Sequence, residues 1–117
     1  MTRSKLQQIA LIVLLALGAY LIFAPKGDTT GGQARELVAA GARLVDVRSP
    51  GEFAAGHLPG AVNIPVDEID GRLGELEPKD APVVVYCRSG ARSSSAARAL
   101  EGAGFSKVHN LGAMSSW

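Results

Sequence analysis

The residues from Cys87 to Ser93 form the most chemically distinctive run of this sequence. The run reads Cys87-Arg88-Ser89-Gly90-Ala91-Arg92-Ser93, and Cys87 is the only cysteine of the chain. Guanidiniums beside a cysteine favour the thiolate, which is the nucleophilic form of the side chain. A glycine lets several backbone N–H groups turn toward one anion, and the start of a following helix adds positive charge. We therefore predict that Cys87 is a nucleophile and that the loop from Arg88 to Ser93 binds a small anion.

The alternative for a lone cysteine is a buried, inert side chain, but its neighbours here are polar and glycine-containing. A single cysteine can form neither an intramolecular disulfide nor a cysteine-rich metal cluster, and His57 and His109 lack the spacing of a zinc site. We therefore predict no metal site. After Arg3 and Lys5, ten basic residues stand against eleven acidic ones, so nothing indicates a nucleic-acid partner.

The elements around this loop must place the cysteine at the end of a strand. Residues 82–86 include three successive valines, which predicts a strand buried on both faces of a parallel sheet. A helix over residues 93–103 follows, and ligands bind beyond the carboxyl ends of such strands. Strands are also expected at residues 43–47, 61–64 and 107–110, and helices at residues 33–40, 50–55 and 66–76. This alternation predicts an α/β architecture with a mostly parallel sheet.

The N-terminal segment is strongly apolar. From Leu6 to Ala24 it has 19 residues, interrupted only by two glutamines, and as a helix it would span roughly 28 Å, close to a hydrocarbon core of about 30 Å. Arg3 and Lys5 precede it, which predicts a single-pass anchor with a cytoplasmic N-terminus and an extracytoplasmic domain, periplasmic in a Gram-negative bacterium. The expected division is residues 1–24 as anchor or uncleaved signal sequence, 25–32 as linker and 33–117 as catalytic domain. A cleaved signal peptide and a buried core helix are the alternatives.

A series of short motifs runs through the chain in a characteristic order: Leu44-Val45-Asp46-Val47-Arg48, Glu52-Phe53, Gly56-His57-Leu58-Pro59-Gly60-Ala61, Asn63-Ile64-Pro65, Val83-Val84-Val85-Tyr86, the loop from Cys87 to Arg92, Gly104-Phe105 and Asn110-Leu111-Gly112. Each motif alone is weak, but together they resemble the rhodanese family of thiosulfate sulfurtransferases from about Ala34 to Trp117. One departure is Gly112-Ala113, where the family often has two glycines. The chain also stops at Trp117, where the family commonly continues.

The resemblance implies a rhodanese-like fold with a mostly parallel five-stranded sheet flanked by helices. It implies that Cys87 carries a persulfide, that the loop amides form a cradle and that Arg92 lines the entrance. Four further residues are expected to support the site: Asp46, Arg48, Glu52 and His57. We expect Arg48 to pair with Glu52, and Asp46 to bond to loop backbone or to an arginine.

The activity implied is transfer of the sulfane sulfur of thiosulfate, or of a persulfide, onto Cys87 and then to a thiol or cyanide. No metal or organic cofactor is expected. One alternative is a membrane-tethered sulfur carrier or binding module for a partner protein. A phosphatase or arsenate reductase is less expected, because those enzymes place arginine six positions after the cysteine, whereas this chain has Arg92 at five and Ser93 at six.

Overall fold

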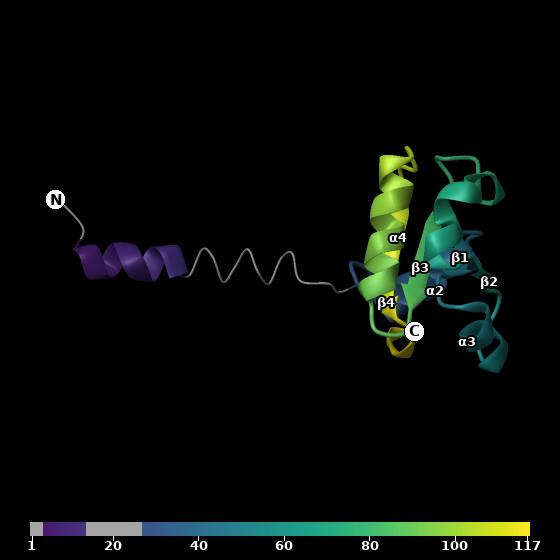
Figure 1. Ribbon diagram of the computed structural model, residues 1–117, viewed down its shortest axis with the longest axis horizontal. Coiled ribbons are helices and arrows are strands. Elements are labelled where there is room, and N and C mark those ends of the chain that lie inside the picture. Colours follow the sequence, from purple (N-terminus) through teal and green to yellow (C-terminus); the bar gives the residue numbers. More distant parts are fainter. Residues whose placement is uncertain (1–3, 14–26) are drawn as a thin grey trace.

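A computed structural model of the chain describes residues 4–13 and 27–117. Residues 5–13 are helical, and the remaining described elements form one α/β domain (Figure 1). Its strands are β1 (Arg43–Asp46), β2 (Val62–Asn63), β3 (Val83–Cys87) and β4 (Val108–Ala113). Its α-helices are α2 (Gly31–Ala39), α3 (Pro50–Ala55) and α4 (Ala91–Gly102), and its 3-10 helices are η1 (Val66–Gly71), η2 (Leu73–Leu76) and η3 (Met114–Ser116).

The sheet is parallel throughout, with strand order β2-β1-β3-β4. All five residues of β3 are buried, as the run of valines predicts for a central strand. The five-stranded sheet implied by the family resemblance is wrong for the described residues, which form four strands. Residues 28 and 29 lie along the outer edge of β4, where both amides donate to the Asn110 carbonyl and the Asn110 amide donates to the Asp28 carboxylate. A backbone ladder does not form there.

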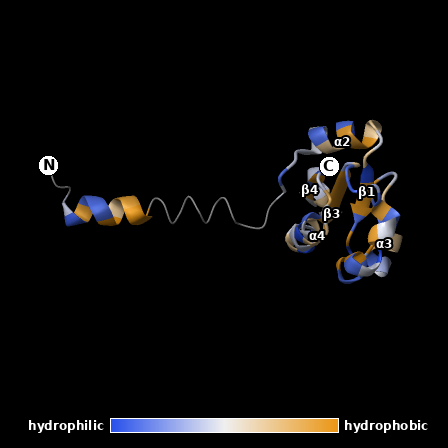
Figure 2. Cartoon of the chain, turned by 90° about the horizontal axis from the view of Figure 1, so that it is seen from above, coloured by the Kyte–Doolittle hydropathy of each residue, from blue (hydrophilic) through white to orange (hydrophobic). Residues whose placement is uncertain are grey.

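Both faces of the sheet are covered. On one face, α4, η1 and η2 pack against an apolar core whose members include Val45, Val85 and Leu100. On the other, α2 and the C-terminal turn cover a smaller cluster that includes Leu44 and Tyr86. Figure 2 shows α2 and α4 on opposite sides of the strands. Since side chains alternate along β3, Tyr86 and Cys87 belong to opposite faces.

The helix starts are set by side-chain caps. The Thr30 hydroxyl accepts from the Gln33 amide at 3.1 Å while the Gln33 side chain accepts from the Thr30 amide at 3.0 Å, so α2 begins at Gly31, before the expected Gln33. Ser49 and Glu52 form the same capping box at α3. The helix expected over residues 66–76 is instead η1 and η2, which meet at Arg72. Gly71 and Gly74 weaken a continuous α-helix in that segment.

The predicted membrane anchor falls largely on residues 1–3 and 14–26, which lie outside the described residues. Within residues 4–13 and 27–117, no helix has both the length and the apolar character needed to cross a bilayer. This finding contradicts the predicted single-pass localisation with an extracytoplasmic domain, and it does not support the membrane as a partner.

Candidate active site

Cys87 ends β3 and lies at the centre of the turn that leads into α4. The Gly90 amide donates a hydrogen bond to its Sγ at 2.9 Å, and the Ser93 Oγ lies 3.5 Å from the same sulfur. The Cys87 side chain is fully buried. Figure 1 shows the start of α4, helix α3 and the C-terminus at the same end of the sheet. Cys87, the predicted nucleophile, is therefore held at the carboxyl end of the central strand, as the sequence pattern predicts.

Two opposing effects act on the pKa of the Cys87 thiol. Burial is the largest single effect and raises that pKa, because it disfavours the charged thiolate. Hydrogen bonds from the Ser93 side chain and from the amides of Ser93, Gly90 and Ser89 act in the other direction. Together they outweigh burial and lower the pKa below its usual value. The loop is thus arranged to stabilise negative charge on sulfur.

The backbone of Gly90 makes this arrangement possible. Gly90 is the N-cap of α4 and has φ 106°, a left-handed conformation that costs energy for any residue with a Cβ. The hydroxyls of Ser93 and Ser94 donate to the Gly90 carbonyl at 3.1 and 2.8 Å. These bonds hold the turn so that its amides face the sulfur.

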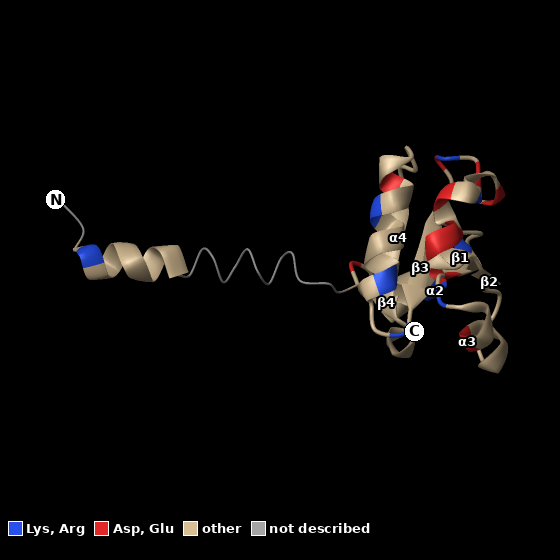
Figure 3. Ribbon diagram, in the orientation of Figure 1, with Lys and Arg blue, Asp and Glu red and all other residues tan. Residues whose placement is uncertain are grey.

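Arg92 forms an ion pair with Glu52 of α3. Its two terminal nitrogens donate to the two carboxylate oxygens of Glu52 at 2.6 and 3.0 Å, a bidentate pair of partly exposed side chains. This hydrogen bonding is the main reason why the pKa of Glu52 falls to about 2. Figure 3 shows the acidic colouring on α3 and basic colouring along α4. The expected pairing of Arg48 with Glu52 is wrong, since Arg92 takes that position.

Arg48 instead pairs with Asp46, two residues before it. The Arg48 Nε donates to Asp46 Oδ1 at 2.9 Å, and the Arg48 amide donates to the same oxygen at 2.9 Å. Hydrogen bonding to Asp46 is the main cause that raises the pKa of Arg48. Arg48 also donates to the Gly56 carbonyl at 2.7 Å, which ties the end of α3 to β1. The expected contact of Asp46 with an arginine is present.

Tyr86 completes this buried group, and sequence reasoning missed its role. Its hydroxyl donates to Asp46 Oδ2 at 2.8 Å and accepts from the Leu58 amide at 3.0 Å. Burial is the main cause that raises the pKa of Tyr86 to about 12. A tyrosine ending a buried run of valines was the available signal, because a buried phenol needs polar partners.

His57 lies outside the sulfur-binding turn. It is exposed, its Nδ1 lies 2.9 Å from the Phe53 carbonyl, and its ring stacks on Phe53 with centroids 3.7 Å apart. The supporting role expected for His57 at the site stays a prediction. Three of the loop residues predicted to bind the anion have exposed side chains: Arg88, Ser89 and Ala91. Their side chains therefore face outward, while the backbone of the loop faces the sulfur.

Comparison with known proteins agrees with this fold. The sequence pattern of the rhodanese-like domain family matches residues 30–117. A sulfurtransferase of Allochromatium vinosum is 47% identical over 75 residues, which are 63% of this chain and 69% of that protein. The thiosulfate sulfurtransferase GlpE of Ectopseudomonas mendocina is 40% identical over 79 residues, 68% of this chain and 72% of its own. The human single-domain sulfurtransferase TSTD1 superposes with a TM-score of 0.66 at 30% identity, covering 80% of this chain and 92% of that structure.

The chain belongs to the rhodanese family and contains a single rhodanese-like domain. Its sulfurtransferase relatives support a role in sulfur transfer.

Proposed function

We propose that this protein takes the sulfane sulfur of thiosulfate, or of a persulfide, onto Cys87 and passes it to a thiol or to cyanide. The observation that carries the proposal is the set of hydrogen bonds on Cys87 Sγ. The Gly90 amide donates to this sulfur at 2.9 Å and the Ser93 Oγ lies 3.5 Å from it, and these contacts favour a thiolate at the end of the central strand. The relatives named as sulfurtransferases support the same chemistry.

In the first half-reaction, the Cys87 thiolate attacks the outer sulfur of thiosulfate. A new S–S bond forms at Cys87 as the S–S bond of thiosulfate breaks, and its electron pair leaves with sulfite. In the second, an acceptor thiolate or cyanide attacks the outer sulfur of the persulfide, and Cys87 departs as a thiolate. The same amides that lower the pKa of Cys87 stabilise it as the leaving group, so the loop serves both steps.

Arg92 has a smaller direct part in this proposal than the sequence suggested. Its guanidinium is already held by both carboxylate oxygens of Glu52, so the ion pair is close to neutral as a unit. We assign most of the stabilisation of the anion to the loop amides and to the start of α4. Arg92 then shapes the entrance by joining α4 to α3.

Two alternatives differ in testable ways. A sulfur carrier for a partner protein would use the same persulfide and change only the acceptor. A phosphatase or arsenate reductase is disfavoured, because position 93 carries a buried serine directed at the sulfur, where those enzymes need an arginine.

Mass spectrometry of the intact protein after treatment with thiosulfate tests the proposal. The wild-type chain should gain the mass of one sulfur atom and lose it on addition of cyanide, with thiocyanate as the product. Cys87→Ser should gain nothing while keeping the circular dichroism spectrum of the folded domain. Equal thiocyanate production by the two proteins would refute the assignment of Cys87.

A further inference from the structure

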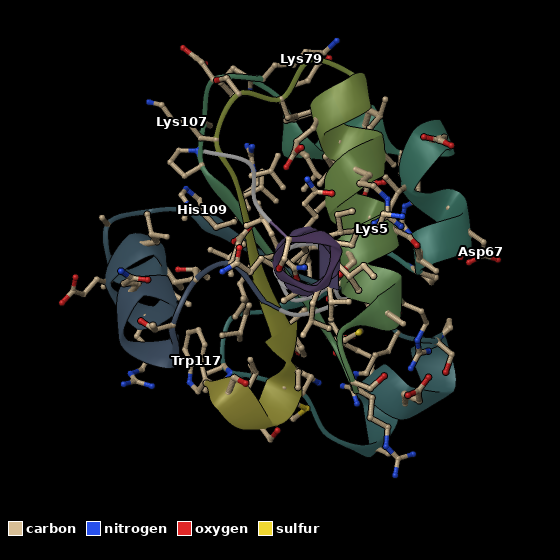
Figure 4. The ribbon with its side chains drawn as sticks, turned by 90° about the vertical axis from the view of Figure 1, so that its left-hand side faces the viewer. Lys5, Asp67, Lys79, Lys107, His109 and Trp117 are labelled. Carbon is tan, nitrogen blue, oxygen red and sulfur yellow. The ribbon has the colours of Figure 1, made fainter. Side chains whose placement is uncertain are left out.

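A shallow hollow lies on the surface next to the active loop, on the face of the sheet that α2 covers. Its volume is about 580 Å³, within the range of sites for small organic molecules. Five residues line it: Leu58, Arg88, Met114, Ser115 and Trp117. Figure 4 shows Trp117 beside α2, next to the C-terminal turn. None of the contacts described above for Cys87 uses this hollow.

Two residues of the hollow directly follow strand ends close to Cys87, one after β3 and one after β4. Arg88 follows Cys87 directly, and Met114 directly follows Ala113, which is paired in register with Cys87. Leu58 is fixed beside them because its amide donates to the hydroxyl of Tyr86. The Cys87 side chain belongs to the cluster on the other face of the sheet, and Arg88, the next residue along the chain, lines the hollow.

The chemistry of the lining indicates what the hollow would hold. Leu58, Met114 and Trp117 give it apolar walls, which offer nothing to a hydrated inorganic ion such as thiosulfate. Arg88 adds an exposed guanidinium, and no acidic side chain in the described part of the chain forms a salt bridge with it. Apolar walls beside one unpaired cation suit an organic molecule with an aliphatic body and a carboxylate.

We propose that this hollow binds the organic part of the acceptor, a small aliphatic thiol that carries a carboxylate. The inference rests on the proposed function, because the bound molecule, as its thiolate, reaches over the loop at Arg88 and attacks the outer sulfur of the Cys87 persulfide. Arg88 pairs with the carboxylate, and Leu58, Met114 and Trp117 contact the aliphatic chain. The outer sulfur passes to the acceptor, and the Cys87 thiolate is released into the amide cradle.

Direct binding is measured on Cys87→Ser protein, which cannot form a persulfide. Trp117 is the only tryptophan of the chain, so its fluorescence reports on the hollow. Titration with 6-mercaptohexanoate should give a saturable change, and 6-mercaptohexan-1-ol should bind about tenfold more weakly because it lacks the charge. In the double variant Cys87→Ser, Arg88→Gln, the acid and the alcohol should bind with equal affinity. Arg98→Gln, which alters an exposed arginine on α4 outside the hollow, should preserve it.

Sulfur transfer is measured separately with the wild-type Cys87. The ratio of kcat/KM for 6-mercaptohexanoate to that for cyanide should fall about tenfold in Arg88→Gln and severalfold in Met114→Ala. If the protein with wild-type Cys87 formed no persulfide, the proposed function would be refuted. The fluorescence titration on Cys87→Ser would still show whether the hollow binds the acid. Normal persulfide formation with no saturable binding, or with equal binding of acid and alcohol, would overturn the acceptor site alone.

Discussion

Ser93 places its hydroxyl beside the sulfur of Cys87. Its hydroxyl lies 3.5 Å from Sγ and also donates to the Gly90 carbonyl, so it belongs to both the turn and the thiol environment. The sequence predicts Ser93 as the last residue of the loop that follows Cys87. That its hydroxyl would face the sulfur could not be read from the sequence, because the direction depends on the left-handed turn at Gly90.

Replacing Ser93 with alanine should raise the pKa of Cys87. Burial of the thiol remains and raises the pKa, while the strongest opposing hydrogen bond is lost. The rate of alkylation by iodoacetamide, measured against pH, reports the thiolate fraction, and its midpoint should move to higher pH in Ser93→Ala.

Ser94→Ala is the matched control for this experiment. The Ser94 hydroxyl donates to the Gly90 carbonyl at 2.8 Å, but Ser94 makes none of the hydrogen bonds at Cys87 Sγ described above. Its alkylation midpoint should stay close to that of the wild type. An equal upward shift in both variants would show that the turn, and not contact with Sγ, sets the pKa.

At the scale of elements, one ion pair joins the two helices that flank the site. Glu52 lies in the first turn of α3 and is also part of its capping box, and Arg92 lies in the first turn of α4. The pair therefore fixes α3 against the start of the helix that follows the nucleophile.

Glu52→Gln should destabilise the domain in a pH-dependent manner. The pKa of Glu52 is lowered to about 2 in the folded protein, below its usual value of 4.5. The contribution of its charge is therefore complete above about pH 4.5 and is lost as the pH falls through about 2. The difference in free energy of unfolding between wild type and Glu52→Gln, from urea titrations, should be constant between pH 6 and 8 and should shrink below about pH 4.5.

Glu36→Gln provides the comparison, because it removes a carboxylate of α2 that forms no salt bridge among the described residues. A difference for Glu52→Gln that stayed constant down to pH 2 would contradict the role of the ion pair.

The elements could be predicted more fully than their contacts. Hydrophobic runs and glycines located the four strands to within a few residues, since local pattern carries that information. The Glu52–Arg92 pair joins residues 40 positions apart, and no local pattern marks such a contact. Arg48 looked like a partner for Glu52 at a spacing of four, but it precedes the cap of α3 and so does not lie on that helix.

At the scale of the whole domain, Tyr86 connects three segments. Its hydroxyl links β3 to Asp46 of β1 and to the amide of Leu58, and Asp46 holds Arg48, which bonds to Gly56. Within the described residues, every buried side-chain nitrogen or oxygen has a hydrogen-bond partner. Breaking one member of such a network leaves the others buried without their partners.

Tyr86→Phe should lower the free energy of unfolding by about 1–3 kcal/mol, because the Leu58 amide and one oxygen of Asp46 lose a buried partner. Urea denaturation of both proteins at pH 7 measures this loss. Ser106→Ala is the comparison for losing an exposed hydroxyl, which contacts the Lys79 carbonyl at 3.4 Å, and it should cost less than about 0.5 kcal/mol. Equal stability of Tyr86→Phe and wild type would show that the hydroxyl contributes nothing net.

The hydrogen bonds between Asp28 and Asn110 have a consequence for how copies of this domain meet. An open strand edge is a template onto which another chain can add a strand, which is a common first step in aggregation. At β4, the Asn110 carbonyl accepts from the amides of Asp28 and Thr29, and the Asn110 amide donates to the Asp28 carboxylate at 2.7 Å. Gly27 approaches so closely that a Cβ there would stand 2.3 Å from the Leu111 carbonyl oxygen. The segment before α2 therefore closes this edge, and at the opposite edge β2 is only two residues long, too short to recruit a neighbouring strand.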